Sequence, residues 1–577
     1  MKTFLKWLAG VIAVFALLLI SIVIIVSLLI DTEPAVVDNS YLHINLSGSL
    51  PEYTAPDAFE EALGKVPMDV KRLRDDLEKA AVDDRINGVV LQLEFLSTGF
   101  GTIEELHQAI AEFRKSGKKI YAYLGPEVAM TRDYYLATAC DSIFMAPTGN
   151  LFLMGVGAEV TFYKDFFKKI GVEAEFLQIG RYKNAPDTYT RSSMSPFQRE
   201  VMENLVDFFY RDIVTTIADS RGFEPDQVES LINNQTGFTG IQAQEAGLVD
   251  GIAYFSDLEQ KMNLYGSKPT KLSAADYSVI PASSLKIRNR SRIAVVNCVG
   301  TIVGGSDSDD PFMGTMMGAN SVASNLESAA NSSSIKAIIL RIDSPGGSAT
   351  AAEIIWNAVK KASQKKPVIA SVSDYGASGG YYIAVGADTM ITAPGALVGS
   401  IGIFAGKFNI QSLYDKLDIN NESIRRGQNS GLFSITEPWT KSERAVVERL
   451  ISDFYEDFLQ KVADSRGMDV EDVRKIAEGR VWTGEEAVKL GLFDFTGSFY
   501  DAVETAKSMA NIDSSESVRL VYYPRSKSLF NQILSNVSMR LKLVKDLSSG
   551  NTEQLIQYLE TIQNRPLAMM PFYITFR

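Results

Sequence analysis

The chain has 577 residues, and its 57 Lys and Arg against 70 Asp and Glu give a net charge of −13. Its length suggests roughly two to four domains, and its acidic balance argues against general nucleic-acid binding, which needs a basic surface. Only two Cys and two His are present, which excludes a disulfide scaffold and a four-cysteine zinc site. A Ser-His-Asp triad could therefore use only His43 or His107.

The N-terminus carries an apolar run, residues 8–30, that contains no charged side chain. A helix over these residues is about 35 Å long, enough to cross a hydrocarbon core of roughly 30 Å. Two lysines precede the run and two acidic residues follow it, so the positive-inside rule predicts residues 1–7 in the cytoplasm and the rest outside. A cleaved signal peptide has a shorter apolar core. We therefore expect an uncleaved transmembrane helix over 8–30.

The rest of the chain consists of two copies of one repeat, in residues 35–266 and 291–577. Matching stretches occur in the same order in both copies, at offsets between 244 and 252, and include INGVVLQLE (86–94) with IKAIILRID (335–343), YYLATACDSIFMAP (134–147) with YYIAVGADTMITAP (381–394), and TGIQAQEAGLVD (239–250) with TGEEAVKLGLFD (483–494). A series of matches in register is not expected by chance. The polar segment 267–290 between the copies is expected to be a linker.

Within each copy, strand patterns alternate with helix patterns. Runs of β-branched residues such as 86–94 predict buried strands, and amphipathic stretches such as 102–115 and 350–363 predict helices. This alternation is typical of βαβ units around a mostly parallel sheet. The sequence therefore predicts an α/β fold, with an N-terminal transmembrane helix followed by two tandem, similar α/β domains.

The two copies differ where chemistry is expected. The second copy carries DSPGGSAT (343–350) after a buried strand, and the first copy has no Pro-Gly-Gly there. Two glycines at a strand end let backbone N–H groups point at a ligand, so Gly346 and Gly347 could form an oxyanion hole. The alternative is an ordinary tight turn, for which Pro-Gly is a common pair.

Two serines of the second copy are candidate nucleophiles. Ser378 lies in GASGGYYIA (376–384), where small residues permit close approach at the start of a helix, and it could equally be a helix N-cap. Ser400 lies in GALVGSIGIFAG (395–406) and aligns with Leu153 of the first copy. The alternative for Ser400 is a buried turn serine bonded to the backbone.

A nucleophilic serine needs a base. His43 and His107 lie in no glycine-rich segment and are expected to be structural, but a lysine that loses its proton in a dry pocket can take the role. Lys183, in GRYKNA (180–185), aligns with Ser430 of the second copy, and a solvated loop lysine is the alternative. Because each copy keeps a residue that the other lacks, we expect a composite site across the domain boundary.

Together these stretches resemble the long-form signal peptide peptidase A (protease IV) family, which are Ser-Lys proteases of the Clp/crotonase-like superfamily. The resemblance rests on RIDSPGGSATAAE (341–353), GASGGYYIA (376–384), LVGSIGIF (397–404), GRYKNA (180–185) with MSP (194–196), and VWTGEEA (481–487). It covers nearly the whole chain, including the anchor and the duplication, and it ends after about Val521.

The resemblance implies a nucleophile at Ser400, a general base at Lys183 and an oxyanion hole at Gly346 and Gly347, and it implies that Ser378 is not the nucleophile. The implied reaction is peptide hydrolysis through an acyl-enzyme, without cofactor or metal. The implied substrates are apolar peptides, notably remnant signal peptides in the membrane. The implied assembly is a homotetramer on the periplasmic side of the bacterial inner membrane.

Two other classes of protein fit the same fold. A crotonase-like acyl-thioester enzyme would use the oxyanion hole without a serine nucleophile, so it would tolerate the loss of Ser400. A non-catalytic membrane scaffold would keep the fold for assembly alone. Loss of hydrolysis in both Ser400→Ala and Lys183→Ala, with folding intact, separates a protease from these two.

Overall fold

The computed structural model describes residues 36–55, 68–125, 127–258, 269–285, 291–310, 314–525 and 567–569, together with the isolated Gly10. The expected transmembrane segment 8–30 lies outside the described residues apart from that glycine. Across the ranges that are described, none of the helices combines the length and the apolar character needed to cross a bilayer.

The first repeat folds around a six-stranded sheet in which neighbouring strands are parallel. The strand order is β10 (Thr270–Ser273), β1 (Ser40–Gly48), β2 (Ile86–Leu96), β3 (Lys119–Leu124), β5 (Ser142–Met145) and β9 (Gly251–Ile252). Parallel strands need crossover connections, and these are α3 (Val70–Val82), α4 (Phe100–Arg114) and α5 (Thr131–Ala137). Helices on the faces bury most of β2, as expected for a strand in such a sheet.

The segment 267–290, expected to be a linker, differs from that expectation where the structure describes it. β10 pairs in parallel with β1, and α12 (Ala274–Ser278) packs against α3. Leu272 and Tyr277 are buried, and Lys79 Nζ donates to the Tyr277 carbonyl oxygen at 3.2 Å. Because its apolar side chains have a core to enter, the segment forms the edge strand of the first sheet and the helix beside it.

The second repeat has a larger sheet of the same kind. The main path is β21 (Val481–Thr483), β19 (Leu397–Gly399), β17 (Val368–Ala377), β15 (Ile335–Ser344), β11 (Arg292–Val299) and β23 (Arg519–Tyr523). Off this path, β18 (Thr389–Thr392) pairs with β17, and β22 (Phe495–Thr496) pairs with β18. The pairs are parallel except β19–β21. The crossover helices are α13 (Ala319–Asn331), α14 (Ala349–Ser363) and α15 (Gly379–Ala384). The expected α/β fold with two similar repeats is confirmed.

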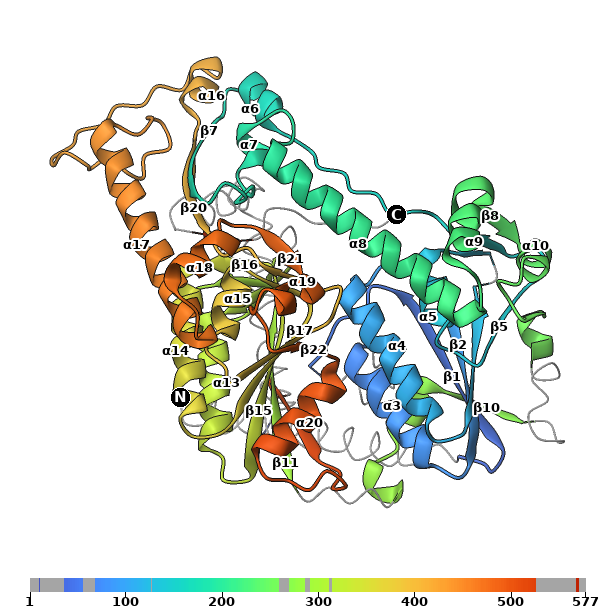
Figure 1. Ribbon diagram of the computed structural model, residues 1–577. Helices are drawn as coiled ribbons and strands as arrows, with labels where there is room; N and C mark the ends of the chain where they lie inside the picture. The colour runs from blue at the N-terminus through green and yellow to red at the C-terminus, as the bar shows by residue number, and fades with distance from the viewer. Residues whose placement is uncertain are drawn as a thin grey trace.

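A third sheet joins the two repeats. Its order is β13 (Ser308–Asp310), β14 (Gly314–Gly318), β12 (Thr301–Val303), β16 (Gly346–Ser348), β24 (Leu567–Met569), β20 (Ile403–Asn409) and β7 (Glu173–Ile179). β7 of the first repeat is antiparallel to β20 of the second along its whole length. This pair forms an arm that rises from the body in Figure 1, with α6 (Lys164–Ile170) and α16 (Gln411–Lys416) at its tip. The pairing brings the residues that follow β7 to the second repeat.

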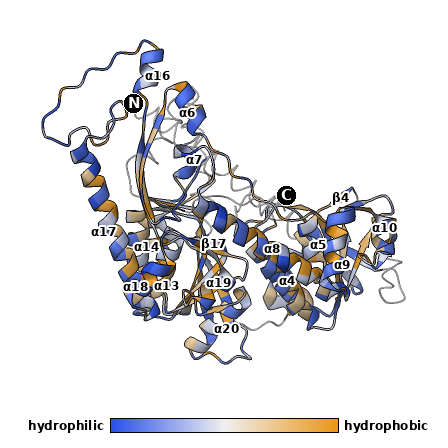
Figure 2. Ribbon diagram, turned by 45° about the horizontal axis from the view of Figure 1, so that its top comes forward, coloured by the Kyte–Doolittle hydropathy of each residue, from blue (hydrophilic) through white to orange (hydrophobic). Residues whose placement is uncertain are grey.

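Two long helices hold the arm and the repeats together. α8 (Pro196–Arg221) runs from the arm to the first repeat, and α17 (Lys441–Arg466) runs beside the second (Figure 1). Both are banded in hydrophilic and hydrophobic colours in Figure 2, as expected for helices that bury one face. α17 contacts both strands of the arm, and α8 of the first repeat contacts β21 of the second. The two repeats therefore form one interlocked unit.

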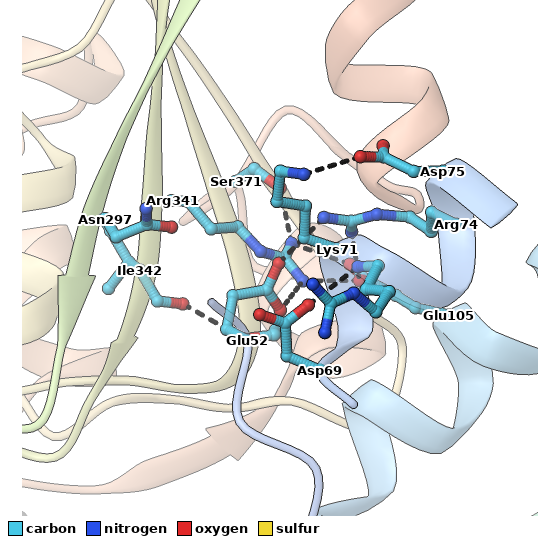
Figure 3. Close-up of polar contacts among 12 residues, drawn as sticks. Glu52, Asp69, Lys71, Arg74, Asp75, Glu105, Asn297, Arg341, Ile342 and Ser371 are labelled. Atoms are coloured by element: carbon cyan, nitrogen blue, oxygen red, sulfur yellow. Dashed lines mark hydrogen bonds and ion pairs between the residues drawn. The ribbon is translucent and has the colours of Figure 1, made fainter. Parts of the chain in front are cut away.

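A buried ionic cluster also connects the repeats (Figure 3). Arg341 on β15 donates to Glu105 Oε1 at 2.7 Å and to Glu52 Oε2 at 2.9 Å. Arg74 donates to the other oxygen of Glu52 at 3.1 Å. All four side chains are buried. Because three of them belong to the first repeat, the cluster ties β15, the strand that ends at Ser344, to that repeat.

Candidate active site

Lys183 reaches the second repeat because of the turn that follows β7. Gly180 has a φ of +100°, and a Cβ on it would lie 2.4 Å from the Glu478 carbonyl oxygen, so only glycine fits there. The Tyr182 N–H then donates to that same oxygen at 2.9 Å. Lys183 packs against Gly479, where an added Cβ would lie 2.6 Å from the Lys183 Cβ. A lysine of the first repeat is therefore seated in the second.

The Lys183 amine lies between two serines. Its Nζ is 2.6 Å from Ser378 Oγ and 3.0 Å from Ser400 Oγ, and it donates to the Ser400 carbonyl oxygen at 3.1 Å. All three residues are fully buried, with 0% of their surface exposed. A basic group within hydrogen-bond distance of a hydroxyl is the arrangement that activation of a serine nucleophile requires.

Both serines occupy sharp turns at strand ends. Ser378 follows β17 and precedes α15 with φ +55° and ψ −111°, and Ser400 follows β19 with φ +50°. A left-handed φ is costly for a residue with a side chain, and such strain clusters at functional sites. The Ser378 N–H donates to the Gly399 oxygen at 2.7 Å, and the Ser400 N–H donates to the Arg480 oxygen at 2.7 Å. The two turns are therefore held at a fixed separation.

Burial lowers the pKa of Lys183 well below the value of an exposed lysine, because a charged ammonium group loses its hydration in the pocket. A neutral amine has two N–H groups and one lone pair. The Ser400 carbonyl oxygen takes one N–H, which leaves one N–H and the lone pair for the two serine hydroxyls. The amine can therefore accept a proton from one serine while it donates to the other.

The glycines of β16 lie beside this cluster. Gly346 and Gly347 have φ values of +101° and +156°, and a Cβ on Gly347 would lie 2.1 Å from the Ile302 carbonyl oxygen of β12. α15, which begins directly after Ser378, contacts β16. The Gly346 N–H donates to Ser344 Oγ at 3.2 Å, and β24 lies opposite both glycines. A close-packed glycine strand therefore borders the serine–lysine cluster.

The first repeat has no matching cluster at the equivalent place. At the repeat offset of 247, Thr131 stands where the second repeat has Ser378, and Leu153 stands where it has Ser400. The Thr131 hydroxyl accepts from the Met154 N–H at 2.8 Å and donates to the Met154 oxygen at 3.0 Å. Backbone groups of Met154 thus satisfy the Thr131 hydroxyl. The buried Leu153 stands where the second repeat has the hydroxyl of Ser400.

A carboxylate also fills the backbone donors of this place in the first repeat. Asp133 stands at the position equivalent to Gly380. Its two oxygens accept from the Leu96 N–H at 2.9 Å and from the Met130 N–H at 2.8 Å. Donors that already bind an internal anion have no capacity for an external one, so this place in the first repeat cannot serve as a second oxyanion site.

The two histidines lie away from the cluster. His43 Nε2 is 3.1 Å from Gln92 Oε1, and His107 Nε2 is 3.3 Å from Thr138 Oγ1. Burial lowers the pKa of both imidazoles, that of His107 to about 4. Their hydrogen-bond partners, Gln92 and Thr138, belong to the first repeat and not to the serine–lysine cluster. Among the described side chains, no group of three His, Cys, Asp or Glu could hold a metal ion.

The structure brings together residues that the sequence analysis singled out for different reasons. It places Lys183 against Ser400, as the complementary repeats predict, and it places Gly346 and Gly347 nearby. It also brings Ser378 to the same amine at the shorter distance, although the family resemblance implied that this serine is not the nucleophile. The available signal was its position at a strand-to-helix junction of small residues.

Comparisons of the sequence with a family model and with curated proteins agree with one another. A family model described as peptidase family S49 matches residues 112–266 and 360–513. The chain is 35% identical over 497 residues to the chloroplastic serine protease SPPA of Arabidopsis thaliana, covering 85% of this chain and 72% of that protein. It is 29% identical over 504 residues to Protease 4 of Haemophilus influenzae, covering 84% and 79%. A solved structure of a ClpP1 mutant from Listeria monocytogenes matches with a TM-score of 0.25 and 16% identity, covering 39% of this chain and 99% of that one.

Proposed function

The chain belongs to peptidase family S49 and is a serine protease, and on that premise we propose that Ser378 is its nucleophile and Lys183 its general base. The observation that carries the proposal is the buried Lys183 amine 2.6 Å from Ser378 Oγ at a strained strand-to-helix turn. The expected nucleophile, Ser400, becomes in this proposal the residue that positions the lysine.

Three features favour Ser378 over Ser400. Its hydroxyl is the closer one to Lys183 Nζ. The chain after it packs against the end of β15, since a Cβ on Gly380 would lie 2.5 Å from the Ser344 carbonyl oxygen. Ser400 contacts the amine through both its hydroxyl and its carbonyl oxygen, and a two-point contact of this kind orients a base.

In the proposed reaction, Lys183 takes the Ser378 proton as Ser378 Oγ attacks the scissile carbonyl carbon and forms a tetrahedral intermediate. Backbone N–H groups of the expected pair, Gly346 and Gly347, and of Gly379, the residue after the nucleophile, stabilise the oxyanion. For this the Gly346 N–H exchanges its contact with the neutral Ser344 hydroxyl for the charged oxygen. The Lys183 ammonium group gives its proton to the leaving amine, and an acyl-enzyme remains. Water, deprotonated by Lys183, then attacks the acyl carbonyl, and its hydrolysis releases the acid and restores the Ser378 hydroxyl.

The proposal extends to substrate and location. The uncharged run 8–30 is long enough to anchor the chain in a membrane, and it would leave the catalytic domains on the periplasmic side of the inner membrane. An enzyme held there meets apolar segments that remain in the bilayer after export. We therefore assign apolar peptides as substrates, notably remnant signal peptides.

The pH dependence of hydrolysis tests this proposal. The kcat/KM for a short apolar peptide ester should rise as the pH rises through the lowered pKa of Lys183 and then level off, because only the neutral amine accepts the Ser378 proton. An exposed lysine would place that rise near about pH 10, and we expect it well below. A rise only near that value, or a fall over the same range, would contradict the assignment.

The same experiment includes a Lys183→Met variant, whose kcat should fall by about 10²–10⁴-fold, as expected for loss of a general base. The variant should be at least as stable as the wild type, since the folded lysine has a lowered pKa and the unfolded chain binds one more proton between the two pKa values. Its advantage in thermal unfolding should grow as the pH falls through that window. Lys361→Met, at an exposed lysine of α14, is the matched control.

We also propose that the chain self-associates through its arm, as a tetramer. Large apolar side chains gather on and beside the tip, namely Phe166 on α6 and Leu417, Ile424 and Phe433 between α16 and α17. Ile424 and Phe433 are 91% and 62% exposed. Apolar side chains concentrated on one projecting element are typical of a surface that a partner covers.

Replacing Ile424 and Phe433 together by serine should therefore raise the dissociation constant of the oligomer by about a hundredfold, in line with the loss of central interface side chains. Light scattering coupled to gel filtration measures the mass of the full-length protein over a dilution series. Ile354→Ser on α14, at a residue 45% exposed away from the arm, is the matched control. An unchanged mass for the double variant would exclude this part of the arm as the interface.

A further inference from the structure

The strand that leads to Ser378 is irregular just before it. β17 pairs with β15 in regular register from Val368 to Val372 and again at Gly376. Between these points Asp343 alone stands opposite residues 373–375, so β17 is bulged there. A bulge re-aims the chain that follows it and leaves its own residues outside the ladder. The position of Ser378 therefore depends on what else holds this bulge.

Helix α4 of the first repeat contacts the bulge. It lies at the boundary between the repeats, against β17 (Figure 1). Its Thr102 donates twice to Asp374, from the N–H to Oδ1 at 2.7 Å and from the hydroxyl to Oδ2 at 2.8 Å. A Cβ on Gly101 would lie 2.2 Å from the Ser373 carbonyl oxygen. The start of α4 is therefore packed closely against residues 373 and 374.

The two repeats cap their equivalent helices differently. At the repeat offset of 249, Ser348 of α14 stands where α4 has Gly99. Ser348 caps its own helix by accepting from the Ala351 N–H at 3.4 Å, whereas Gly99 makes no side-chain cap. The Asp374 carboxylate takes that place in the first repeat, since a Cβ on Gly99 would lie 2.1 Å from its Cγ. A residue of the second repeat thus caps a helix of the first.

Helix α4 also contacts the segment that leads to the other serine. Glu104 Oε2 accepts from the Gly395 N–H at 2.8 Å, and Gly395 lies five residues before Ser400. This contact does not involve Asp374, so it should keep α4 against the second repeat when Asp374 is replaced. Loss of the Asp374 side chain should then release the bulge without separating the repeats.

We propose that Asp374 is a positioning residue for hydrolysis, which bonds the bulge of β17 to Thr102 and so holds Ser378 Oγ within reach of the Lys183 amine. The inference rests on the function proposed above, because it takes Ser378 as the nucleophile. The Asp374 carboxylate contacts neither the lysine nor the serine. It acts on the distance between them, so its loss should lower kcat and leave KM nearly unchanged.

The variants Asp374→Ala and Asp374→Asn test the contact itself. In Asp374→Ala the kcat for a short apolar peptide ester should fall by about 10–100-fold, the scale of a misplaced catalytic group. The pH of the rise in activity should not move, because burial alone lowers the pKa of Lys183. Asp374→Asn should recover most of the lost kcat, since an amide can accept from the Thr102 N–H and donate to its hydroxyl. A kcat in Asp374→Ala within about threefold of the wild type, or no recovery in Asp374→Asn, would overturn the proposal.

Moving the carboxylate from one repeat to the other separates positioning from helix capping. In the double variant Gly99→Asp with Asp374→Ala, the new side chain enters the space of the removed carboxylate and caps α4 from its own N-cap position. The melting temperature should rise from that of Asp374→Ala toward the wild-type value, while kcat should stay low because the bulge of β17 remains unbound. Recovery of kcat together with stability would show that Asp374 serves only as a cap, and the inference would be wrong.

A double-mutant cycle and a control on the same strand make the result independent of that design. Thr102→Val removes the hydroxyl partner, and combining it with Asp374→Ala should lower kcat no further than Asp374→Ala alone. Multiplied losses would contradict a shared contact. Asp388→Ala removes a carboxylate that accepts from the Val368 N–H at 2.8 Å, at the opposite end of β17. It should keep the wild-type kcat, and a loss like that of Asp374→Ala would indicate a general loosening of the strand.

Hydrogen exchange distinguishes failure of this inference from failure of the proposed function, because it needs no activity. The amides of residues 375–378 should exchange faster in Asp374→Ala and in the double variant than in the wild type. The amides of residues 102–105 should exchange faster in Asp374→Ala alone, since the double variant restores the cap. Wild-type exchange of 375–378 in Asp374→Ala would exclude Asp374 as the residue that holds the bulge, even if Ser378→Ala and Lys183→Met abolish hydrolysis.

Discussion

Ser378→Ala should lower kcat for hydrolysis of a short apolar peptide ester by about 10⁴-fold or more, as the loss of a nucleophile does. Ser400→Ala should lower it by only about 10–100-fold, the scale expected when a catalytic group is misplaced rather than removed. The difference arises because the Lys183 amine in Ser400→Ala still has the residue-400 carbonyl oxygen at 3.1 Å and Ser378 Oγ at 2.6 Å. In Ser378→Ala the attacking oxygen is gone.

A trapped acyl-enzyme decides between the two serines directly. The enzyme is mixed with an activated peptide ester, quenched in acid within the burst phase, digested and mapped by mass spectrometry. The acyl group should be on the peptide that contains Ser378. Acyl transfer to Ser400, together with a larger loss in Ser400→Ala than in Ser378→Ala, would restore the assignment that the family resemblance implied.

Ser373→Ala provides the matched control for both variants. Ser373 is a fully buried serine on the same strand, β17, and its hydroxyl donates to the Ile342 oxygen at 3.4 Å rather than to the lysine. Its replacement removes one buried hydroxyl without touching the cluster, so kcat should stay within about threefold of the wild type. A loss similar to that in Ser378→Ala would show that these variants report on folding instead of chemistry.

Much of the fold could be predicted because local sequence patterns indicate its strands and helices. The runs 86–94 and 335–343 are β-branched and apolar, and both form buried parallel strands at those positions. The duplication also predicted that Lys183 and Ser400 lie together. Lys183 and Ser400 were singled out because each copy keeps one of them, and β7 pairs with β20 so that the two meet.

The meeting of the two serine turns and the places of the segments 267–290 and 567–569 depend on long-range contacts, which local sequence patterns do not encode. Ser378 and Ser400 are 22 positions apart, and sequence alone could not say that both turns converge on one amine. The segment 267–290 reads as polar, but a few apolar side chains are enough to make it an edge strand once β1 offers a free edge. Residues 567–569 lie in a tail that departs from the family, so no motif pointed to their place beside β16.

Arg341→Met should lower the free energy of unfolding by about 3–5 kcal/mol, because it removes one partner from a buried ionic cluster. The Arg341 guanidinium donates to Glu52 at 2.9 Å and to Glu105 at 2.7 Å, and Arg74 alone would then face both carboxylates (Figure 3). Burial raises the pKa of both carboxyls, but for Glu52 the guanidinium groups of Arg341 and Arg74 outweigh it and lower the pKa overall. Without Arg341 both pKa values should rise.

The pH dependence of that loss identifies its cause. A carboxyl whose folded pKa lies above its unfolded pKa destabilises the folded state as the pH rises, so the deficit of Arg341→Met should be small near pH 5 and grow toward pH 8, as measured by chemical denaturation. Adding Glu105→Gln should recover part of it. Arg474→Met, which breaks a partly exposed pair with Glu456, should cost about 0–1 kcal/mol at either pH. A deficit that does not change with pH would point to lost packing. Side-chain packing rather than ion pairing would then stabilise the contact between the repeats.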